Sequence, residues 1–466
     1  IKPLGALSVN GSLNVTNNFT IESENTGTGS LIDKGILTID GNTYINRYLG
    51  TNGTTNNWRY VSSPVGSALS AVIDPESAGS HMFYWSEPDD AYQEVTTNTE
   101  LMNILRGYAV ASSGARTVTF NGTPNSSTFD TTLSRTTSNN YEGFNLVGNP
   151  YPSSINWDTA TWNNSNIKPT IWYRTSGNFA TYNKQFGSGT NGGQEYIPAM
   201  QAFWIRVGDT TSTGSLQASN DVRTHQHPGF YKKRNKDKSN IFRLVANRGE
   251  YSDEMLLGFF ENASNYYDGY DSEKMFASDE NYLQLYMDVE GKEVVINGMK
   301  NFDEKYEVPV GIRVMKEGEF TLTASNISEF NPNVEVLLED KFKNSFTDLR
   351  ANSTYTFTSE ETDTTGRFAL HFKKSATDIP GVEEDGAIEI YSFKETIFVD
   401  ISEQAFTENE TKVKIFNVLG QEIYNEVRNM NMGKNMLTPN LESGYYIVKL
   451  INAEKTKSKR VYLENR

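Results

Sequence analysis

Two stretches near the C-terminus decide the fold class: residues 412–424 read KVKIFNVLGQEIY, and residues 444–450 read GYYIVKL. The residues that share one face of the second stretch at strand spacing are Tyr446, Val448 and Leu450. The first stretch turns at Gly420, because glycine takes the positive φ of a hairpin turn at little cost, and then continues as a return strand. The pattern predicts a strand–turn–strand unit within a small β-sandwich over residues 381–466.

Three separated sequence elements in this region follow one order along the chain. They are Val413-x-Ile415-x-Asn417-x-x-Gly420-Gln421, then Leu441-x-x-Gly444-Tyr445-Tyr446, then Lys459-Arg460-Val461-Tyr462. Their order and their place at the chain end resemble the type A C-terminal sorting domain of type IX secretion cargo in Bacteroidota. The alternative interpretation is a plain terminal immunoglobulin-like module, which is common in secreted proteins.

The resemblance implies a route and a set of partners. Such cargo folds in the periplasm, passes through an outer-membrane translocon and is received by a barrel-type shuttle protein, and a sortase-like protease commonly removes the domain. The residues expected to serve sorting and partner binding are Gly420, Gly444, Tyr445, Tyr446, Lys457, Lys459, Arg460 and Val461. Gly444 is expected to take a positive φ at a turn. The basic residues of the last strand either dock the machinery or merely protect an exposed edge from aggregation.

Composition fits an exported protein and excludes several function classes. The chain has 466 residues and no cysteine, so neither disulfides nor thiol catalysis are available. Its formal charge of −16 argues against nucleic acids and anionic membrane surfaces as partners. No apolar run approaches the roughly 18 residues of a membrane span. Because Ile1 begins in mid-pattern, we expect a mature or N-terminally truncated chain.

Residues 1–45 contain a loose internal repeat. Short apolar alternations such as Ala6-Leu7-Ser8-Val9 and Ile36-Leu37-Thr38-Ile39 are separated by turns of glycine and asparagine. This pattern is typical of the end of a parallel β-solenoid, in which case further coils lie upstream. An ordinary β-meander is the alternative.

Two further β-sandwiches are expected in the body, at residues 46–230 and 240–374. In the first, Asn149-Pro150 and Tyr151-Pro152 disfavour helix and favour fixed corners between strands. The first segment resembles modules of large Bacteroidota surface proteins that carry the same sorting domain, and that family brings no settled activity. Its tryptophans are expected in the core, with a sugar-stacking platform as the alternative; they are Trp58, Trp85, Trp157, Trp162, Trp172 and Trp204.

The boundaries of these segments follow from two linkers. Residues 225–238 combine Pro-Gly with the only dense basic run of the chain, and residues 375–385 are polar and contain a second Pro-Gly. The second linker reads as an exposed tether where a protease can cut. Asp340 and Arg367, in the middle segment, are candidates for an ion pair between strands.

Residues for catalysis or metal binding are sparse. The four histidines are scattered, and no zinc-protease, serine-hydrolase or nucleotide-binding motif is present, so no cofactor or metal is expected. His225-x-His227 lies in a linker, and residues 268–274 are interpreted as an acidic turn rather than a calcium loop. Asp158-Thr159-Ala160 matches a short O-glycosylation pattern, which makes Thr159 a candidate modification site.

The sequence therefore predicts an all-β, multidomain, non-enzymatic protein that is exported to the cell surface or the medium by the type IX system. Its body is expected to be adhesin-like or structural. The alternative is a carbohydrate-binding accessory region, with surface glycans as partners, or the non-catalytic tail of a larger secreted enzyme.

Overall fold

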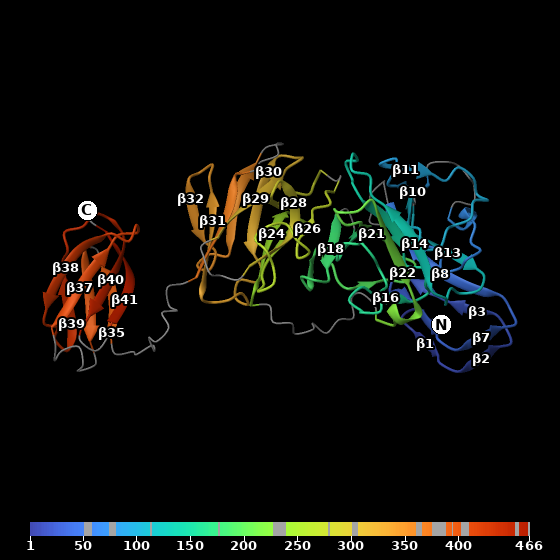
Figure 1. Cartoon of the computed structure of the whole chain (residues 1–466), viewed down its shortest axis with the longest axis horizontal. Coiled ribbons are helices and arrows are strands. Elements are labelled where there is room, and N and C mark those ends of the chain that lie inside the picture. Colours follow the sequence, from blue (N-terminus) through green and yellow to red (C-terminus); the bar gives the residue numbers. More distant parts are fainter. Residues whose placement is uncertain are drawn as a thin grey trace. The chain divides into compact units, whose positions relative to one another are not determined.

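The computed structural model describes residues 1–50, 58–73, 81–111, 114–175, 178–226, 239–277, 280–300, 306–359, 366–374, 388–393, 395–401, 410–452 and 456–464. The chain divides into two compact units, residues 1–374 and 375–466. Both are built from strands (Figure 1), and the helical elements of the described ranges are the short 3-10 turns η1 (Ser70–Val72) and η2 (Asn220–Val222). Over the same ranges, no helix has the length and apolar character needed to cross a membrane. The expected all-β class is confirmed.

The N-terminal strands pair in parallel at a constant offset. The pairs are β1 (Ala6–Val9) with β6 (Ser30–Asp33), β2 (Ser12–Val15) with β7 (Ile36–Ile39), and β3 (Phe19–Ile21) with β8 (Thr43–Leu49). Ala6 faces Ser30, Ser12 faces Ile36 and Phe19 faces Thr43, each 24 residues apart. A side chain at Gly35 would place its Cβ 2.0 Å from the carbonyl oxygen of Gly11, so the glycine lets one turn stack on the next. The register is that of stacked coils and not of an antiparallel meander.

Several small sheets follow, where a single sandwich was expected at residues 46–230. One has four strands: β11 (Ala91–Glu94), β10 (Met82–Ser86), β12 (Tyr108–Ala111) and β9 (Trp58–Val61). Another has five: β15 (Phe144–Gly148), β21 (Ala202–Arg206), β17 (Thr170–Arg174), β18 (Phe179–Asn183) and β19 (Ser188–Thr190). The other strands of residues 46–226 are β13 (Arg116–Asn121), β14 (Phe129–Ser134), β16 (Ser154–Asn156), β20 (Tyr196–Ile197), β22 (Thr213–Ala218) and β23 (Arg223–Thr224). The short strands β4 (Ser23–Glu24) and β5 (Gly27–Thr28) belong to the N-terminal segment.

The middle segment forms one long sheet rather than two facing sheets. Its order is β32 (Ser345–Asp348), β31 (Val334–Asp340), β34 (Phe368–Lys374), β29 (Tyr306–Arg313), β27 (Gln284–Val289), β28 (Lys292–Met299), β25 (Tyr251–Phe259), β24 (Ile241–Arg248), β30 (Gly318–Ala324) and β33 (Thr354–Ser359), with β26 (Ser272–Glu273) beside β28. Phe242 and Phe372, on strands far apart in this order, have ring centroids only 5.3 Å apart. The sheet therefore curls around one apolar core.

The two ends of this sheet approach each other through a polar contact. The hydroxyl of Tyr355 on β33 donates to Asp340 on β31 at 2.8 Å, and Arg367 pairs with the same carboxylate at 3.0 Å. The expected ion pair between Asp340 and Arg367 is confirmed. This contact links β33 to β31, near the opposite end of the sheet, so the curled sheet is almost closed into a barrel. The sequence predicted a second sandwich here, and the structure has this single sheet instead.

Polar contacts join the five-stranded sheet to the curled sheet. Thr170 and Ser272 are linked through their hydroxyls at 2.8 Å, and the indole of Trp172 donates to the carbonyl of Glu273 at 2.9 Å. Phe186 packs within the core of the curled sheet. Residues 1–226 and 239–374 are therefore extensively connected, and their independence as domains stays a prediction.

The C-terminal unit is a two-layer β-sandwich. One sheet contains β35 (Ile388–Phe393), β36 (Thr396–Ile401) and β39 (Gly433–Leu437); the other contains β38 (Glu422–Arg428), β37 (Thr411–Phe416), β40 (Gly444–Ile451) and β41 (Thr456–Leu463). Side chains from both sheets meet in one core, which includes Val399, Ile415 and Val448. The face assigned to Tyr446, Val448 and Leu450 from the sequence is indeed the buried one.

Candidate functional site

The hairpin between β37 and β38 is closed by Asn417 and Gly420. The side-chain oxygen of Asn417 accepts from the amides of Leu419 and Gln421, each at 3.0 Å. Gly420 has a φ of 77°, so the turn uses the left-handed conformation that glycine adopts freely. The role expected for Gly420 in the turn is confirmed.

The expectation of a positive φ at Gly444 is wrong. This glycine begins β40 outside the left-handed region, and an added Cβ would meet the Tyr446 ring at ordinary contact distances, 3.7 Å at the closest. A glycine at a strand entry therefore need not mark a tight turn; here the chain simply extends into the strand.

We expect the two glycines to respond differently to valine. Gly420→Val should destabilise the C-terminal sandwich by about 1–2 kcal/mol, because a β-branched residue is strained at positive φ. Gly444→Val should change its stability by less than about 0.5 kcal/mol, since valine suits an extended strand. Native-state hydrogen exchange of the β37 and β40 amides in the full chain measures both. Equal losses in the two variants would contradict the assignment of the turn.

The expected sorting residues divide between the surface and the core of this sandwich. Tyr446 and Val461 are buried, and the Tyr446 hydroxyl donates to the carbonyl of Glu442 at 2.8 Å. Tyr445 is 56% exposed on the outer face of the four-stranded sheet. Buried members of the set can act only through folding, whereas the exposed ones are open to a partner.

The last strand, β41, is an edge strand of its sheet. It pairs with β40 on one side. Lys459 and Arg460 are exposed and Lys457 is partly exposed. The guanidinium of Arg460 lies 5.3 Å from the ring centroid of Tyr445, whose ring is 5.0 Å from that of Tyr462. Edge backbone, basic groups and two aromatic rings thus occur together.

An apolar part of this surface was not anticipated from the sequence. The exposed large apolar side chains of the four-stranded sheet and its hairpin, here called the outer face together with Arg460, are Val418, Leu419, Ile423, Val427, Tyr445, Ile447 and Tyr462. Alternation along β38 and β40 could have signalled it, because these residues occupy the positions opposite the core face. Exposed apolar residues on paired strands, such as Tyr445 and Ile447 on β40 with Tyr462 on β41, are typical of protein interaction surfaces, whereas Lys412 of β37 lies between them and Val427 on β38.

The tryptophans of the body fall into two groups. Trp157 and Trp172 are fully buried, and Trp162 packs against Trp157 with its indole bonded to the carbonyl of Asn156 at 2.7 Å. These three serve the core, as expected. The other three, Trp58, Trp85 and Trp204, line cavities.

The largest of these cavities has a volume of about 810 Å³. Trp85 and Trp204 meet in its wall with ring centroids 5.5 Å apart, and Tyr92 and Tyr141 pack edge-on against Trp85. The indole nitrogens of both tryptophans are buried and have no hydrogen-bond partner in the described part of the chain. The cavity combines aromatic rings with polar groups.

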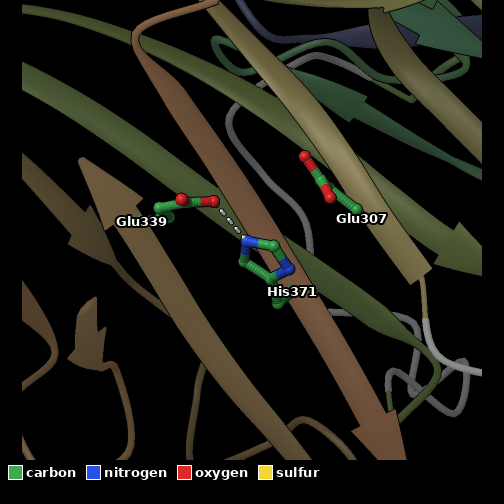
Figure 2. Close-up of side chains that lie close together, drawn as sticks. All are labelled: Glu307, Glu339 and His371. Atoms are coloured by element: carbon green, nitrogen blue, oxygen red, sulfur yellow. Dashed lines mark hydrogen bonds and ion pairs between the residues drawn. The ribbon is translucent and has the colours of Figure 1, made fainter. Parts of the chain in front are cut away.

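A histidine and two glutamates lie close together on the curled sheet (Figure 2). The Nε2 atom of His371 is 2.7 Å from a carboxylate oxygen of Glu339, while Glu307 comes from the neighbouring strand β29. These residue types bind zinc. However, the ammonium of Lys341 lies 2.9 Å from Glu307 and already neutralises it. The hydrogen bond between His371 and Glu339 and the ion pair between Lys341 and Glu307 therefore account for the cluster.

The remaining candidate residues have local structural roles. His225 contacts the hydroxyls of Ser8 and Ser30, both at 2.8 Å, and His227 lies outside the described residues. Thr159 is partly exposed, with its hydroxyl 2.9 Å from that of Thr161. In the acidic turn, the carboxylates of Asp268 and Asp271 accept backbone amides, including that of Gly298 at 2.9 Å. These bonds support a turn at residues 268–271, whereas Ser272 and Glu273 form the strand β26, so the expected turn is shorter than residues 268–274.

Comparisons with known proteins identify two segments. A family described as "Domain of unknown function (DUF8693)" matches residues 1–372, and one described as "Secretion system C-terminal sorting domain" matches residues 393–464. No curated protein matches the chain. Among solved structures, it shows a distant similarity to Tp47, the 47-kilodalton lipoprotein of Treponema pallidum, with 7% identity and a TM-score of 0.15 over 57% of this chain and 69% of that one. A TM-score this low carries no argument about fold or function.

Proposed function

Because the chain belongs to the DUF8693 family over residues 1–372 and carries a secretion-system C-terminal sorting domain at residues 393–464, we propose that it is type IX cargo delivered by a translocon and a shuttle barrel. The sorting domain implies export across the outer membrane to the cell surface or the medium. The finer proposal is that the outer face and the strand β41 are what these partners bind.

The observation that carries this proposal is the combination of features on one side of the terminal sandwich. An edge strand offers backbone groups for pairing with another sheet, and Lys459 and Arg460 add positive charge to it. Tyr445 and Tyr462 supply exposed aromatic area beside that charge. Aromatic residues and arginine are the residue types most enriched where protein interfaces derive their binding energy.

We propose a non-catalytic, adhesin-like or structural role for the body once it is outside. Removal of the sorting domain by a sortase-like protease would act in the tether at residues 375–385, which lies outside the described residues. A second candidate function, carbohydrate binding, is favoured by the cavities lined by Trp58, Trp85 and Trp204.

Charge reversal on the last strand tests the proposed binding surface. Lys457→Glu, Lys459→Glu and Arg460→Glu together should strongly reduce export and capture by the shuttle. The three changes make the net charge of this strand more negative by six units, so an acidic partner surface would be repelled. Stability should change by no more than roughly 1 kcal/mol, as for other surface substitutions. Immunoblots of periplasm and medium measure export, and thermal unfolding measures stability.

A matched control carries the same charge change on the body, at Lys2, Lys34 and Lys316, which is exposed. Its export should stay at the wild-type level, since these lysines are remote in sequence from the sorting domain. Normal export of a folded triple variant of the last strand would show that the lysines merely protect an edge.

A further inference from the structure

Three arginines line one cavity of about 320 Å³ in the body. Arg47 comes from β8, Arg59 from β9 and Arg174 from the end of β17. Among the residues that the structure describes, the lining of this cavity includes no aspartate or glutamate. In a protein with a net charge of −16, this is an unusual concentration of uncompensated positive charge.

The hydrogen bonds of these arginines are few and go to neutral groups. Arg59 donates to the carbonyls of Gly50 and Trp58, at 2.9 and 3.2 Å. Arg47 donates to the side chain of Gln201 at 3.3 Å, and its Nε is buried without a partner. In the part of the chain that the structure describes, the guanidinium of Arg174 donates no hydrogen bond and lies 5.8 Å from the ring centroid of Phe179. Within the described ranges, none of the three arginines has a carboxylate partner.

Burial and the positive charge of a neighbouring arginine both disfavour the charged forms of Arg47 and Arg59. Burial lowers the pKa of Arg47 to about 10, and the charge of Arg59 acts in the same direction. Burial likewise lowers the pKa of Arg59, with a further contribution from Arg174. An anion placed beside Arg47 and Arg59 would offset both their desolvation and the repulsion between the neighbouring positive charges.

An aromatic cavity of about 310 Å³ adjoins the cationic one. The two cavities share Trp58, Tyr60 and Arg174 in their walls. Phe83 packs edge-on against Trp58 at 5.6 Å, and the hydroxyls of Tyr60 and Tyr92 are 3.0 Å apart. These contacts hold a rigid apolar wall directly beside the guanidinium groups.

We propose that the two cavities form one binding site for an acidic sugar, a pyranose ring that carries a carboxylate or sulfate group. The ring would lie against Trp58 and Tyr92, and the anionic group would lie among Arg47, Arg59 and Arg174. Guanidinium groups suit this role, because their planar donors match a carboxylate or sulfate in pairs. Aromatic rings offer an amphipathic ring the apolar contact it needs.

The size and charge of the site select this ligand class. A neutral sugar would leave three partly buried cations without a counter-charge, which is less favourable than pairing them with an anion. A long polyanion such as nucleic acid is repelled by the acidic remainder of the protein. The combined volume of the two cavities lies well within the range of small-molecule sites, which suits one or two sugar rings. The inference rests on the second candidate function, carbohydrate binding by the body, and does not depend on the export proposal.

The experiment is calorimetric titration of the purified full chain with four probes: tetragalacturonate, a sulfated galactan tetrasaccharide, neutral galactotetraose and benzoate. At least one acidic oligosaccharide should bind at least tenfold more tightly than the neutral one. That preference should weaken in high salt, because screening reduces the attraction of the partly exposed arginines. Equal binding of acidic and neutral sugars, no sugar binding, or binding of benzoate alone would overturn the proposal.

Two variants place the site. Arg174→Gln should lower affinity for the acidic probe at least tenfold and leave any weak binding of the neutral probe unchanged, since the side chain of Arg174 makes no hydrogen bond within the described ranges. Arg428→Gln, a matched change in the C-terminal sandwich, should leave both unchanged. Should Arg174→Gln not fold, Arg174→Lys keeps the charge but not the planar donors, and an intermediate loss is expected. Unchanged acidic-sugar binding in a folded Arg174 variant would overturn the assigned location.

Discussion

Deletion of residues 375–466 is expected to reduce export to background and to leave the body, residues 1–374, in the periplasm. The deletion removes the whole sorting domain, and each sheet of the molecule lies wholly within one of the two compact units. The truncated body therefore lacks the export signal, but it keeps every described strand of its own sheets. Immunoblots of periplasm, outer membrane and medium measure the distribution.

Two controls separate failed export from failed folding. The truncated body should unfold in urea at the same denaturant concentration as the body within the full chain, because its core is intact. A fluorescent protein that carries a signal peptide and residues 375–466 should leave a cell that possesses the type IX system. Wild-type levels of truncated body in the medium would overturn the proposed role of the sorting domain.

The terminal sandwich was the most predictable part of the molecule, because its information is local. Alternation at Tyr446, Val448 and Leu450 identifies the buried face of β40, and Gly420 identifies a hairpin turn. The prediction for Gly444 was wrong because it also used local information only. A glycine next to a strand favours a turn, but the backbone dihedrals show that Gly444 does not adopt a positive φ.

Long-range geometry limited prediction of the body. The stacked coils could be proposed from a repeat, because pairing at a constant offset leaves a periodic trace in the sequence. The curled sheet left no such trace: its order places β34 between β31 and β29, and nothing in the strand patterns specifies those pairings. Paired cavities that depend on Arg47, Tyr92 and Arg174 could not be anticipated from one sequence, because their residues come from separate sheets.

Asp253 is the most completely enclosed carboxylate in the contacts that join the sheets of the body. Its side chain has no solvent exposure and lies 2.6 Å from the ammonium of Lys274, which is 2% exposed. It also accepts from the side-chain amides of Asn178 and Asn191, both at 2.9 Å, and from the backbone amide of Leu285 at 2.8 Å. The two asparagines come from before residue 226 and the other partners from after residue 239.

Asp253→Ala is expected to lower the free energy of unfolding of the body by about 3–5 kcal/mol, because it leaves a buried cation, two buried donors and one partly buried donor without their acceptor. Lys341→Ala, which breaks the partly exposed pair with Glu307, should have little effect. Urea unfolding followed by tryptophan fluorescence reports on residues 58–204 only, because all six tryptophans lie there, whereas Asp253 lies beyond them. The measurement therefore shows whether destabilisation at Asp253 spreads to the preceding segment. If residues 1–374 unfold as one cooperative unit, the fluorescence midpoint must fall together with that of the far-ultraviolet circular dichroism. A fluorescence midpoint that stays at its wild-type value would instead establish residues 46–230 and 240–374 as independently folding domains.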